Sequence, residues 1–191
     1  MIINVRGTSG SGKSHLVRRI MELYPIKNRI FTEGRKQPVG YWLRRSELQE
    51  KDRPLFVVGH YETACGGGDT ITAGIEEVYR MVRQAIDQGN DVMYEGLIVQ
   101  NDAARCIELC QKNPNNHIVI LLSTPIDECL ASVQARRAER GNDKPLNPTN
   151  TEKSFKSTLA QRSRFRDAGV NWQHLGREQA FEVSKRLLGL L

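Results

Sequence analysis

Eight residues near the start of the chain have the types and spacing that bind phosphate. They match the pattern G-x-x-x-x-G-K-[ST] and are Gly7, Thr8, Ser9, Gly10, Ser11, Gly12, Lys13 and Ser14. Glycines let successive backbone N–H groups point at a phosphate, and the N-terminus of a following helix adds partial positive charge. Lys13 can then reach the β- and γ-phosphates, while the Ser14 hydroxyl can bind Mg²⁺. The stretch predicts a site for ATP and Mg²⁺.

A carboxylate that could serve this site is Glu95. It follows a run of apolar residues within 91–98, which is typical of a buried strand. Ligands gather at the carboxyl ends of parallel strands, so we expect Glu95 near the phosphates. Its first expected role is a water-mediated contact to Mg²⁺, and its second is activation of the acceptor. The alternative is a surface residue at a strand end.

A second carboxylate, Asp69, follows three consecutive glycines, which could let a substrate approach the backbone closely. Transfer of a phosphoryl group to an alcohol needs a group that takes the hydroxyl proton, and Asp69 is our candidate. Aspartate is also a favoured N-cap, so Asp69 could equally cap a helix expected over 71–88. His60 and Glu62 are weaker candidates for the same role.

Three arginines are predicted to close over the phosphates. A helix that begins after Pro125 and runs to about residue 140 carries Arg136, Arg137 and Arg140 near its end. A loop rich in Asn, Pro and Gly follows, so we expect a basic lid over 136–150. Arginines of a lid neutralise the transferring group and exclude water. The alternative is that these cations only complement the helix dipole.

The elements that must position these residues alternate between strands and helices. Residues 2–5 read as a buried strand and residues 15–24 as an amphipathic helix that Pro25 ends, so the phosphate motif has the required strand–loop–helix context. This alternation predicts one α/β domain over 1–191 with a doubly wound, mostly parallel five-stranded sheet. An insert over about 34–62 should place strands 38–45 and 55–62, as a hairpin with a long connection, above the phosphate loop.

The distribution of charge along the chain indicates which kinds of partner the protein could bind. The net charge of the 191 residues is +6. Residues 131–166 contain nine Lys or Arg and three Asp or Glu, so this segment accounts for the whole excess. It is either a surface for polyanions or a solvated helix face.

The four cysteines, Cys65, Cys106, Cys110 and Cys129, form no C-x-x-C pair and have no histidine at zinc spacing, so we expect buried free thiols. No apolar run reaches the roughly 20 residues that span a membrane, and no signal peptide is apparent, so we expect a cytoplasmic protein without membrane partners.

The phosphate motif, Glu95-Gly96, Pro125 before the arginine-bearing helix and the short strand 170–175 together resemble the small P-loop nucleotide kinases. The chain lacks the Asp-Arg pair of thymidylate kinases and the Asp-Gly-Phe-Pro-Arg of adenylate kinases. The stretch 59–71, with Tyr94-Glu95-Gly96-Leu97, resembles the phage kinases of thymine hypermodification.

That second resemblance implies transfer of the γ-phosphate of ATP to the hydroxymethyl group of 5-hydroxymethyluracil in DNA. DNA would then be the substrate, and the basic segment would contact its backbone. Two alternatives stay open: a kinase of a free nucleoside, nucleotide or small metabolite, and a regulatory NTPase that has no acceptor.

Overall fold

A computed structural model describes residues 1–46, 53–63, 66–97, 102–142 and 144–190. Cys65 lies outside these residues. The strands are β1 (Ile2–Arg6), β2 (Ile26–Ile30), β3 (Gly40–Arg44), β4 (Leu55–Val58), β5 (Asp91–Glu95), β6 (His117–Leu122) and β7 (Trp172–Leu175). The helices are α1 (Lys13–Glu22), α2 (Ile75–Asp87), α3 (Asp102–Lys112), α4 (Ile126–Ala138), α5 (Thr149–Asp167) and α6 (Arg177–Leu187), with a 3-10 turn at Gly68–Thr70.

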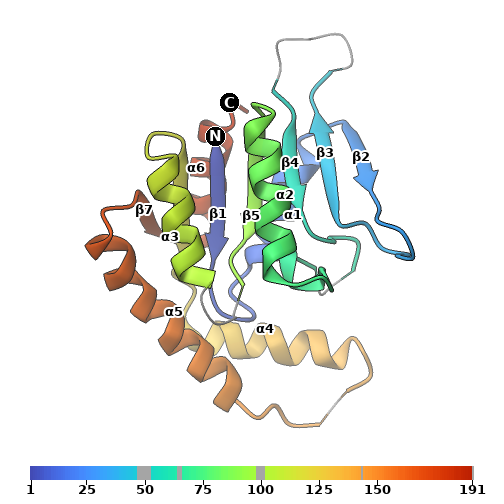
Figure 1. Cartoon of the computed structure of the whole chain (residues 1–191). Coiled ribbons are helices and arrows are strands. Elements are labelled where there is room, and N and C mark those ends of the chain that lie inside the picture. Colours follow the sequence, from blue (N-terminus) through green and yellow to red (C-terminus); the bar gives the residue numbers. More distant parts are fainter. Residues whose placement is uncertain (47–52, 64–65, 98–101, 143, 191) are drawn as a thin grey trace.

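The strands form one mixed seven-stranded sheet in the order β2-β3-β4-β5-β1-β6-β7 (Figure 1). Five neighbouring strands of this order run parallel to one another: β4, β5, β1, β6 and β7. β3 pairs antiparallel with β4 and with β2. The prediction of an α/β fold is therefore confirmed, but the prediction of five strands is wrong. The expected insert supplies the difference, because β3 and β4 extend the main sheet instead of standing above the phosphate loop.

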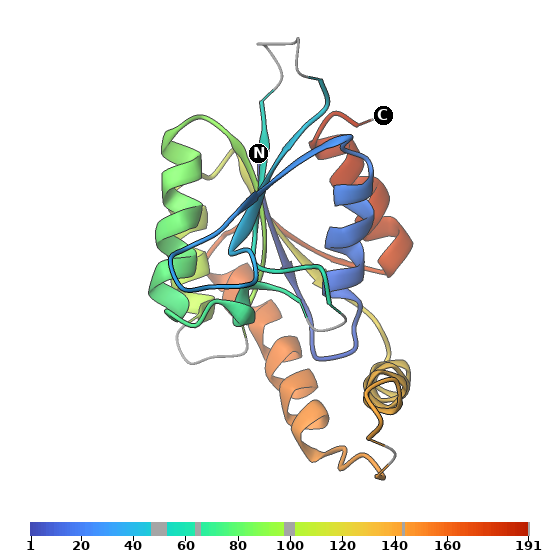
Figure 2. The same ribbon diagram turned by 90° about the vertical axis from the view of Figure 1, so that its right-hand side faces the viewer.

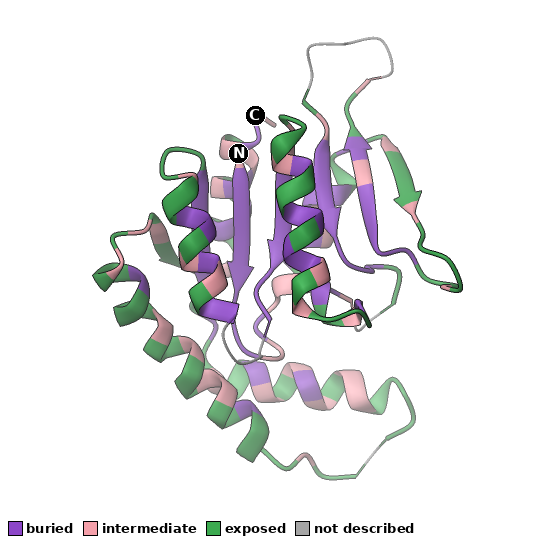
Figure 3. Ribbon diagram, viewed as in Figure 1, coloured by how far each residue is buried: buried purple, intermediate pink, exposed green. Residues whose placement is uncertain are grey.

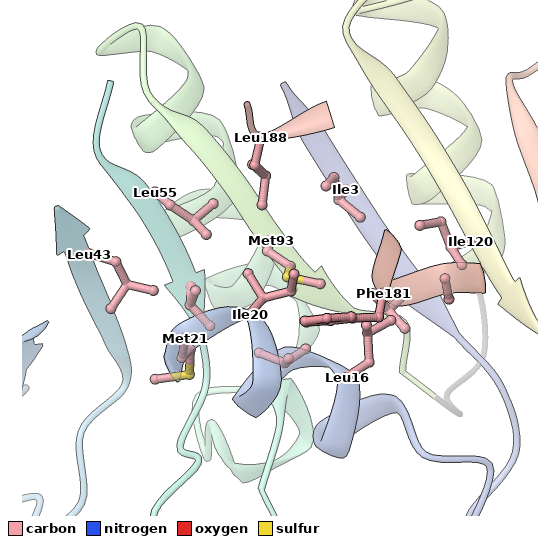
Figure 4. Close-up of a cluster of buried hydrophobic side chains, with 14 of the residues drawn as sticks. Ile3, Leu16, Ile20, Met21, Leu43, Leu55, Met93, Ile120, Phe181 and Leu188 are labelled. Atoms are coloured by element: carbon pink, nitrogen blue, oxygen red, sulfur yellow. The ribbon is translucent and has the colours of Figure 1, made fainter. Parts of the chain in front are cut away.

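Helices cover both faces of the sheet (Figure 2). On one face, α1 and α6 pack against each other and against the central strands through a cluster that includes Leu16, Ile20 and Phe181 (Figure 4). On the other face, α2 packs on β4 and β5, and the two buried cysteines of α3 pack on β6. β1 lies between β5 and β6 and is buried along its whole length, because apolar surface is removed from water on both of its faces.

The carboxyl ends of the parallel strands point toward α4 and α5 (Figure 1). α5 is largely exposed and α4 is a mixture of exposed and half-buried residues (Figure 3). Each helix has two buried residues, Cys129 and Val133 in α4 and Thr151 and Phe165 in α5. The structure therefore places the phosphate motif, the end of β5 and these two helices at one edge of the sheet. This is where parallel α/β sheets bind ligands.

Candidate active site

The phosphate loop has the expected strand–loop–helix setting, between β1 and α1. Gly10 and Gly12 have φ angles of +81° and +101°, which other residues rarely adopt. A Cβ atom on Gly10 would lie 2.2 Å from the carbonyl oxygen of Cys129 in α4. The Thr124 hydroxyl donates a hydrogen bond to the Ser11 carbonyl at 2.7 Å. Thr124 thus serves the loop and does not cap α4, whose N-cap is Pro125.

Lys13, the first residue of α1, is held inside the loop that precedes it. Its ammonium group donates hydrogen bonds to the carbonyls of Gly7 at 2.9 Å and Thr8 at 3.2 Å. Burial lowers the pKa of Lys13, whereas the nearby charges of Glu95 and Asp69 act in the opposite direction. The structure therefore brings together three of the residues that the sequence predicted, one cation and two carboxylates, beside the phosphate loop.

Glu95 is the last residue of β5 and pairs in register with Val5 of β1. Its side chain is 5% exposed, and its Oε1 atom has no hydrogen-bond partner among the described residues. Burial raises the pKa of Glu95, and the charge of Lys13 opposes that effect. A buried carboxylate oxygen without a partner is costly unless a cation or a donor approaches it.

Mg²⁺ fits the donors at this position. The Ser14 side chain lies at the start of α1, where its hydroxyl donates a 3.3 Å hydrogen bond to the carbonyl of Gly66. Ser14 and Glu95 both line the same cavity. Mg²⁺ takes oxygen ligands and usually keeps several of its waters. The unpartnered Glu95 oxygen and the Ser14 hydroxyl are therefore suitable ligands, directly or through water.

Asp69 lies in the 3-10 turn and its side chain is exposed into the same cavity. The alternative that it caps a helix is wrong, because α2 begins only at Ile75 and its N-cap is Gly74. Gly67, with φ of +119°, separates the two carboxylates. A Cβ atom there would lie 3.1 Å from the Glu95 carboxyl group and 3.2 Å from Asp69 Oδ1.

The glycine triplet also has a use within the fold. A Cβ atom on Gly66 would lie 2.2 Å from the carbonyl oxygen of His60, and the Gly67 N–H donates a 2.8 Å hydrogen bond to that carbonyl. The protein's own backbone thus approaches Gly66 and Gly67 closely, while Gly66 and Gly68 also line the cavity. His60 itself is buried, and burial lowers its pKa. Glu62 forms an ion pair with Arg29 at 2.5 Å. Neither side chain lines the cavity that contains Asp69.

The cavity has a volume of about 920 Å³, and its lining residues come from two groups of segments. The phosphate loop and helices α1, α4 and α6 contribute a polar set: Ser9, Gly10, Gly12, Lys13, Ser14, Ser132, Arg136 and Arg177. The segment before and at the start of α2 and the residues after β5 contribute a more apolar set: Gly66, Gly68, Asp69, Ile71, Ile75 and Leu97. Glu95 lines the same cavity. The polar set can hold a phosphate chain, and the second set can hold a partly apolar acceptor.

The three predicted lid arginines do not share one position. Arg136 lines the cavity and its charge acts on Lys13. Arg137 instead donates to the side chain of Asn142 at 3.3 Å. Arg140 is exposed beyond the end of α4 at Ala138. Of the three, the structure brings only Arg136 to the cavity.

Two further arginines in the cavity wall were missed by the sequence reasoning. Arg177, at the start of α6, donates to the carbonyls of Ser11 at 3.0 Å and Gly10 at 3.2 Å. Its guanidinium would lie 2.9 Å from a Cβ atom on Gly12. Arg18 donates to the Tyr61 carbonyl at 2.9 Å. The one available signal was the place of Arg177 after the last predicted strand, at the edge where ligands bind.

The thiols Cys106, Cys110 and Cys129 are free and buried, as expected. However, His117 lies beside the first two, and the potential ligand atoms of these three residues are within 4.8 Å of one another. The sequence did not indicate this, because His117 is brought to α3 by the packing of β6. Cys106 donates to Asn4 at 3.4 Å and receives a 3.8 Å contact from the Tyr94 hydroxyl. The cluster lies within the core, away from the cavity.

Six basic residues are exposed on α5 and the loop before it, and we call them together the α5 basic surface: Lys144, Lys153, Lys156, Arg162, Arg164 and Arg166. Among the described helices, none is long and apolar enough to cross a membrane.

Three related proteins found by sequence comparison carry the same name. No family model matches the chain. The 5-hmdU DNA kinase of Pseudomonas phage PaMx11 is 44% identical over 188 residues, which are 98% of this chain and 96% of that protein. The 5-hmdU DNA kinase of Delftia phage PhiW-14 is 29% identical over 88% of this chain and 65% of that protein. The 5-hmdU DNA kinase of Pseudomonas phage M6 is 28% identical over 75% of this chain and 74% of that protein.

A solved structure of deoxyadenosine kinase from M. mycoides with bound dATP covers 99% of this chain, at 15% identity and a TM-score of 0.41. The assignment rests on the sequence relatives, and foremost on the protein of phage PaMx11, whose similarity extends over nearly the full length of both chains. The P-loop cavity described above lies within the matched length. The chain belongs to the 5-hmdU DNA kinase family.

Proposed function

We propose that this protein transfers the γ-phosphate of ATP to the hydroxymethyl group of 5-hydroxymethyluracil in DNA, as one step of the hypermodification of thymine in phage DNA. One observation carries the proposal. Lys13 and two carboxylates line one cavity in a chain that is 44% identical to a 5-hmdU DNA kinase over 98% of its length. A reaction on phage DNA with ATP would take place in the host cytoplasm.

The transfer assigns a role to each side chain. The acceptor oxygen forms a bond to the γ-phosphorus while the bond from that phosphorus to the bridging oxygen breaks, and ADP leaves. Lys13 and Arg136 stabilise the negative charge of the transferring group and of the leaving ADP. Asp69 takes the proton of the acceptor hydroxyl. Its exposed carboxylate suits this role better than the buried Glu95 does, because it can reach an acceptor without leaving a charge unpaired.

Glu95 and Ser14 would hold Mg²⁺, which neutralises phosphate charge when it is bound. The support for this role is the unpartnered Glu95 oxygen. A general base at Glu95 would have to compete with Lys13 for the same carboxylate. We therefore assign Glu95 to the metal and Asp69 to the proton.

DNA binding is supported by the position of the α5 basic surface. α5 lies at the carboxyl edge of the sheet, as the cavity does (Figure 1). Its side chains can contact the phosphates of a strand whose target base enters the cavity. A base in a duplex must leave the stack before its substituent can reach such a site. The apolar side chains Ile71, Ile75 and Leu97 supply a surface for the extruded pyrimidine.

The test is an acceptor comparison with radiolabelled ATP. Duplex DNA that contains 5-hydroxymethyluracil, the same duplex with thymine, and free 5-hydroxymethyl-2′-deoxyuridine and its monophosphate are each incubated with the protein. We expect label only in the hydroxymethylated DNA, and we expect Lys13→Ala to abolish it. Label in the free nucleoside or nucleotide but not in DNA would refute DNA as the acceptor. ATP hydrolysis without any labelled acceptor would instead support a regulatory NTPase.

A further inference from the structure

The residue that directly precedes the phosphate loop is a buried arginine that the proposed chemistry does not use. Arg6 ends the central strand β1 and is 2% exposed. Burial acts to lower its pKa, but the facing carboxylate of Asp102 and neighbouring groups more than offset this, so Arg6 stays charged. Replacing a buried ion pair by apolar residues is often neutral or stabilising, so such a pair is weak evidence for a role in stability.

The contacts of Arg6 lead to the segment that carries Glu95. Arg6 forms an ion pair with Asp102, at the start of α3. The same carboxylate oxygen accepts a 3.0 Å hydrogen bond from the N–H of Leu97. Arg6 also packs directly on Gly96, where a Cβ atom would lie 2.7 Å from the guanidinium carbon. Arg6 and Asp102 thus fix the two residues that follow Glu95.

Two further contacts of Arg6 lead to helix α5. The Arg6 Nε–H donates to the side-chain oxygen of Gln161 at 2.7 Å. The guanidinium also lies over the ring of Phe165, 5.5 Å from its centre, and Phe165 is fully buried. One arginine therefore contacts both the helix that carries the α5 basic surface and the backbone beside Glu95.

We propose that Arg6 is a positioning residue that holds the segment Glu95–Leu97 in its catalytic arrangement, and that Gln161 couples this arrangement to the docking of helix α5. The inference rests on the proposed function, since the α5 basic surface is there assigned to DNA. DNA that binds to α5 in the correct position preserves the hydrogen bond between Arg6 and Gln161. Arg6 in turn holds the backbone after Glu95, so that the Glu95 carboxylate stays directed into the cavity. The rate of phosphoryl transfer then depends on the position that α5 adopts when DNA is bound, in addition to the affinity for DNA.

Gln161→Met is the suitable test, because it keeps the length of the side chain and removes the oxygen that accepts from Arg6. Gln161 is half-buried on α5, so this variant disturbs the core less than a substitution of Arg6. The matched variant Gln161→Glu keeps an oxygen acceptor. The control Gln173→Met makes the same change at an exposed position of β7.

The readouts are kcat and KM for phosphorylation of 5-hydroxymethyluracil DNA, together with the Kd of DNA from fluorescence anisotropy. We expect Gln161→Met to lower kcat by at least about fivefold, the lower end of ordinary coupling between sites, with the Kd of DNA changed less than about twofold. Gln161→Glu should keep a kcat close to the wild type, as should Gln173→Met.

Unchanged kcat in Gln161→Met would overturn the inference, as would a change confined to KM and Kd. Equal loss of kcat in Gln161→Glu would also overturn it, because the hydrogen bond would then not be the cause. The wild-type reaction is the reference for the proposed function. Absence of DNA phosphorylation by the wild type defeats that function, whereas normal wild-type turnover with an unaffected Gln161→Met defeats only the coupling through Arg6.

Discussion

Replacing Glu95 by glutamine should make the protein more stable and much less active. The structure buries this carboxylate at 5% exposure with one oxygen unpartnered among the described residues. Burial raises its pKa above the ordinary 4.5 even though Lys13 lies nearby. The ionised side chain is therefore less favourable in the folded protein than in the unfolded chain, and a neutral side chain of the same shape removes that difference.

The sign of the expected change follows from the direction of this pKa. The pKa is raised although the attraction to Lys13 acts to lower it, so the cost of burying the charge is the larger of the two effects. Glu95→Gln should therefore raise the free energy of unfolding at neutral pH, and a gain of about 1 kcal/mol would move Tm by roughly 2–4 °C in a protein of this size.

The sign of the pH dependence follows from the same argument. Well below pH 4.5 the carboxyl group is protonated in both states, so Glu95→Gln and the wild type should have equal stability. As the pH rises, the unfolded chain releases the proton first, and the wild type loses stability relative to the variant until the pH exceeds the raised pKa. Above that pH the difference is constant.

The assay is thermal unfolding of both proteins, without ATP or Mg²⁺, at several pH values between about 4 and 8. Glu22→Gln, an exposed position at the end of α1, is the control and should show no such pattern. Phosphoryl transfer by Glu95→Gln should fall by at least about 100-fold. A lower Tm than the wild type at neutral pH would refute the reasoning, since it would mean that pairing with Lys13 outweighs burial. A difference that does not vary with pH would refute it too.

Two further substitutions test the assigned roles. Asp69→Asn should lower kcat by about 100-fold or more, in the usual range for general base catalysis, while ATP titration gives an unchanged affinity; retained turnover would exclude Asp69 as the base. Arg136→Ala should lower kcat by about tenfold or more, because Arg136 lines the cavity, whereas Arg137→Ala should leave kcat nearly unchanged, since Arg137 contacts Asn142. Equal losses in steady-state assays of these two arginine variants would contradict the observed arrangement.

The sequence by itself determined the parts of the site that depend on local order. The residues Gly7 to Ser14 between a strand and a helix define the phosphate loop, because its shape needs glycines at fixed spacing and its charge comes from the helix that follows directly. The position of Glu95 near the phosphates could also be predicted, because the carboxyl end of a buried strand lies at the ligand-binding edge of a parallel sheet. The alternation of strands and helices was sufficient for the α/β class.

The tertiary structure decided what depends on contacts between distant segments. Strand pairing extended the sheet to seven strands, because the parallel pairing of β4 with β5, which joins the insert to the main sheet, is not visible in the composition of either strand. Packing alone distinguished Arg136 from Arg137, although they are adjacent in sequence, and brought Arg177 to the phosphate loop. Arg6, Asp102 and Gln161 are separated by up to 155 residues and carry no motif. Only folding places one guanidinium between them, since a buried charge must find its partners wherever the chain supplies them.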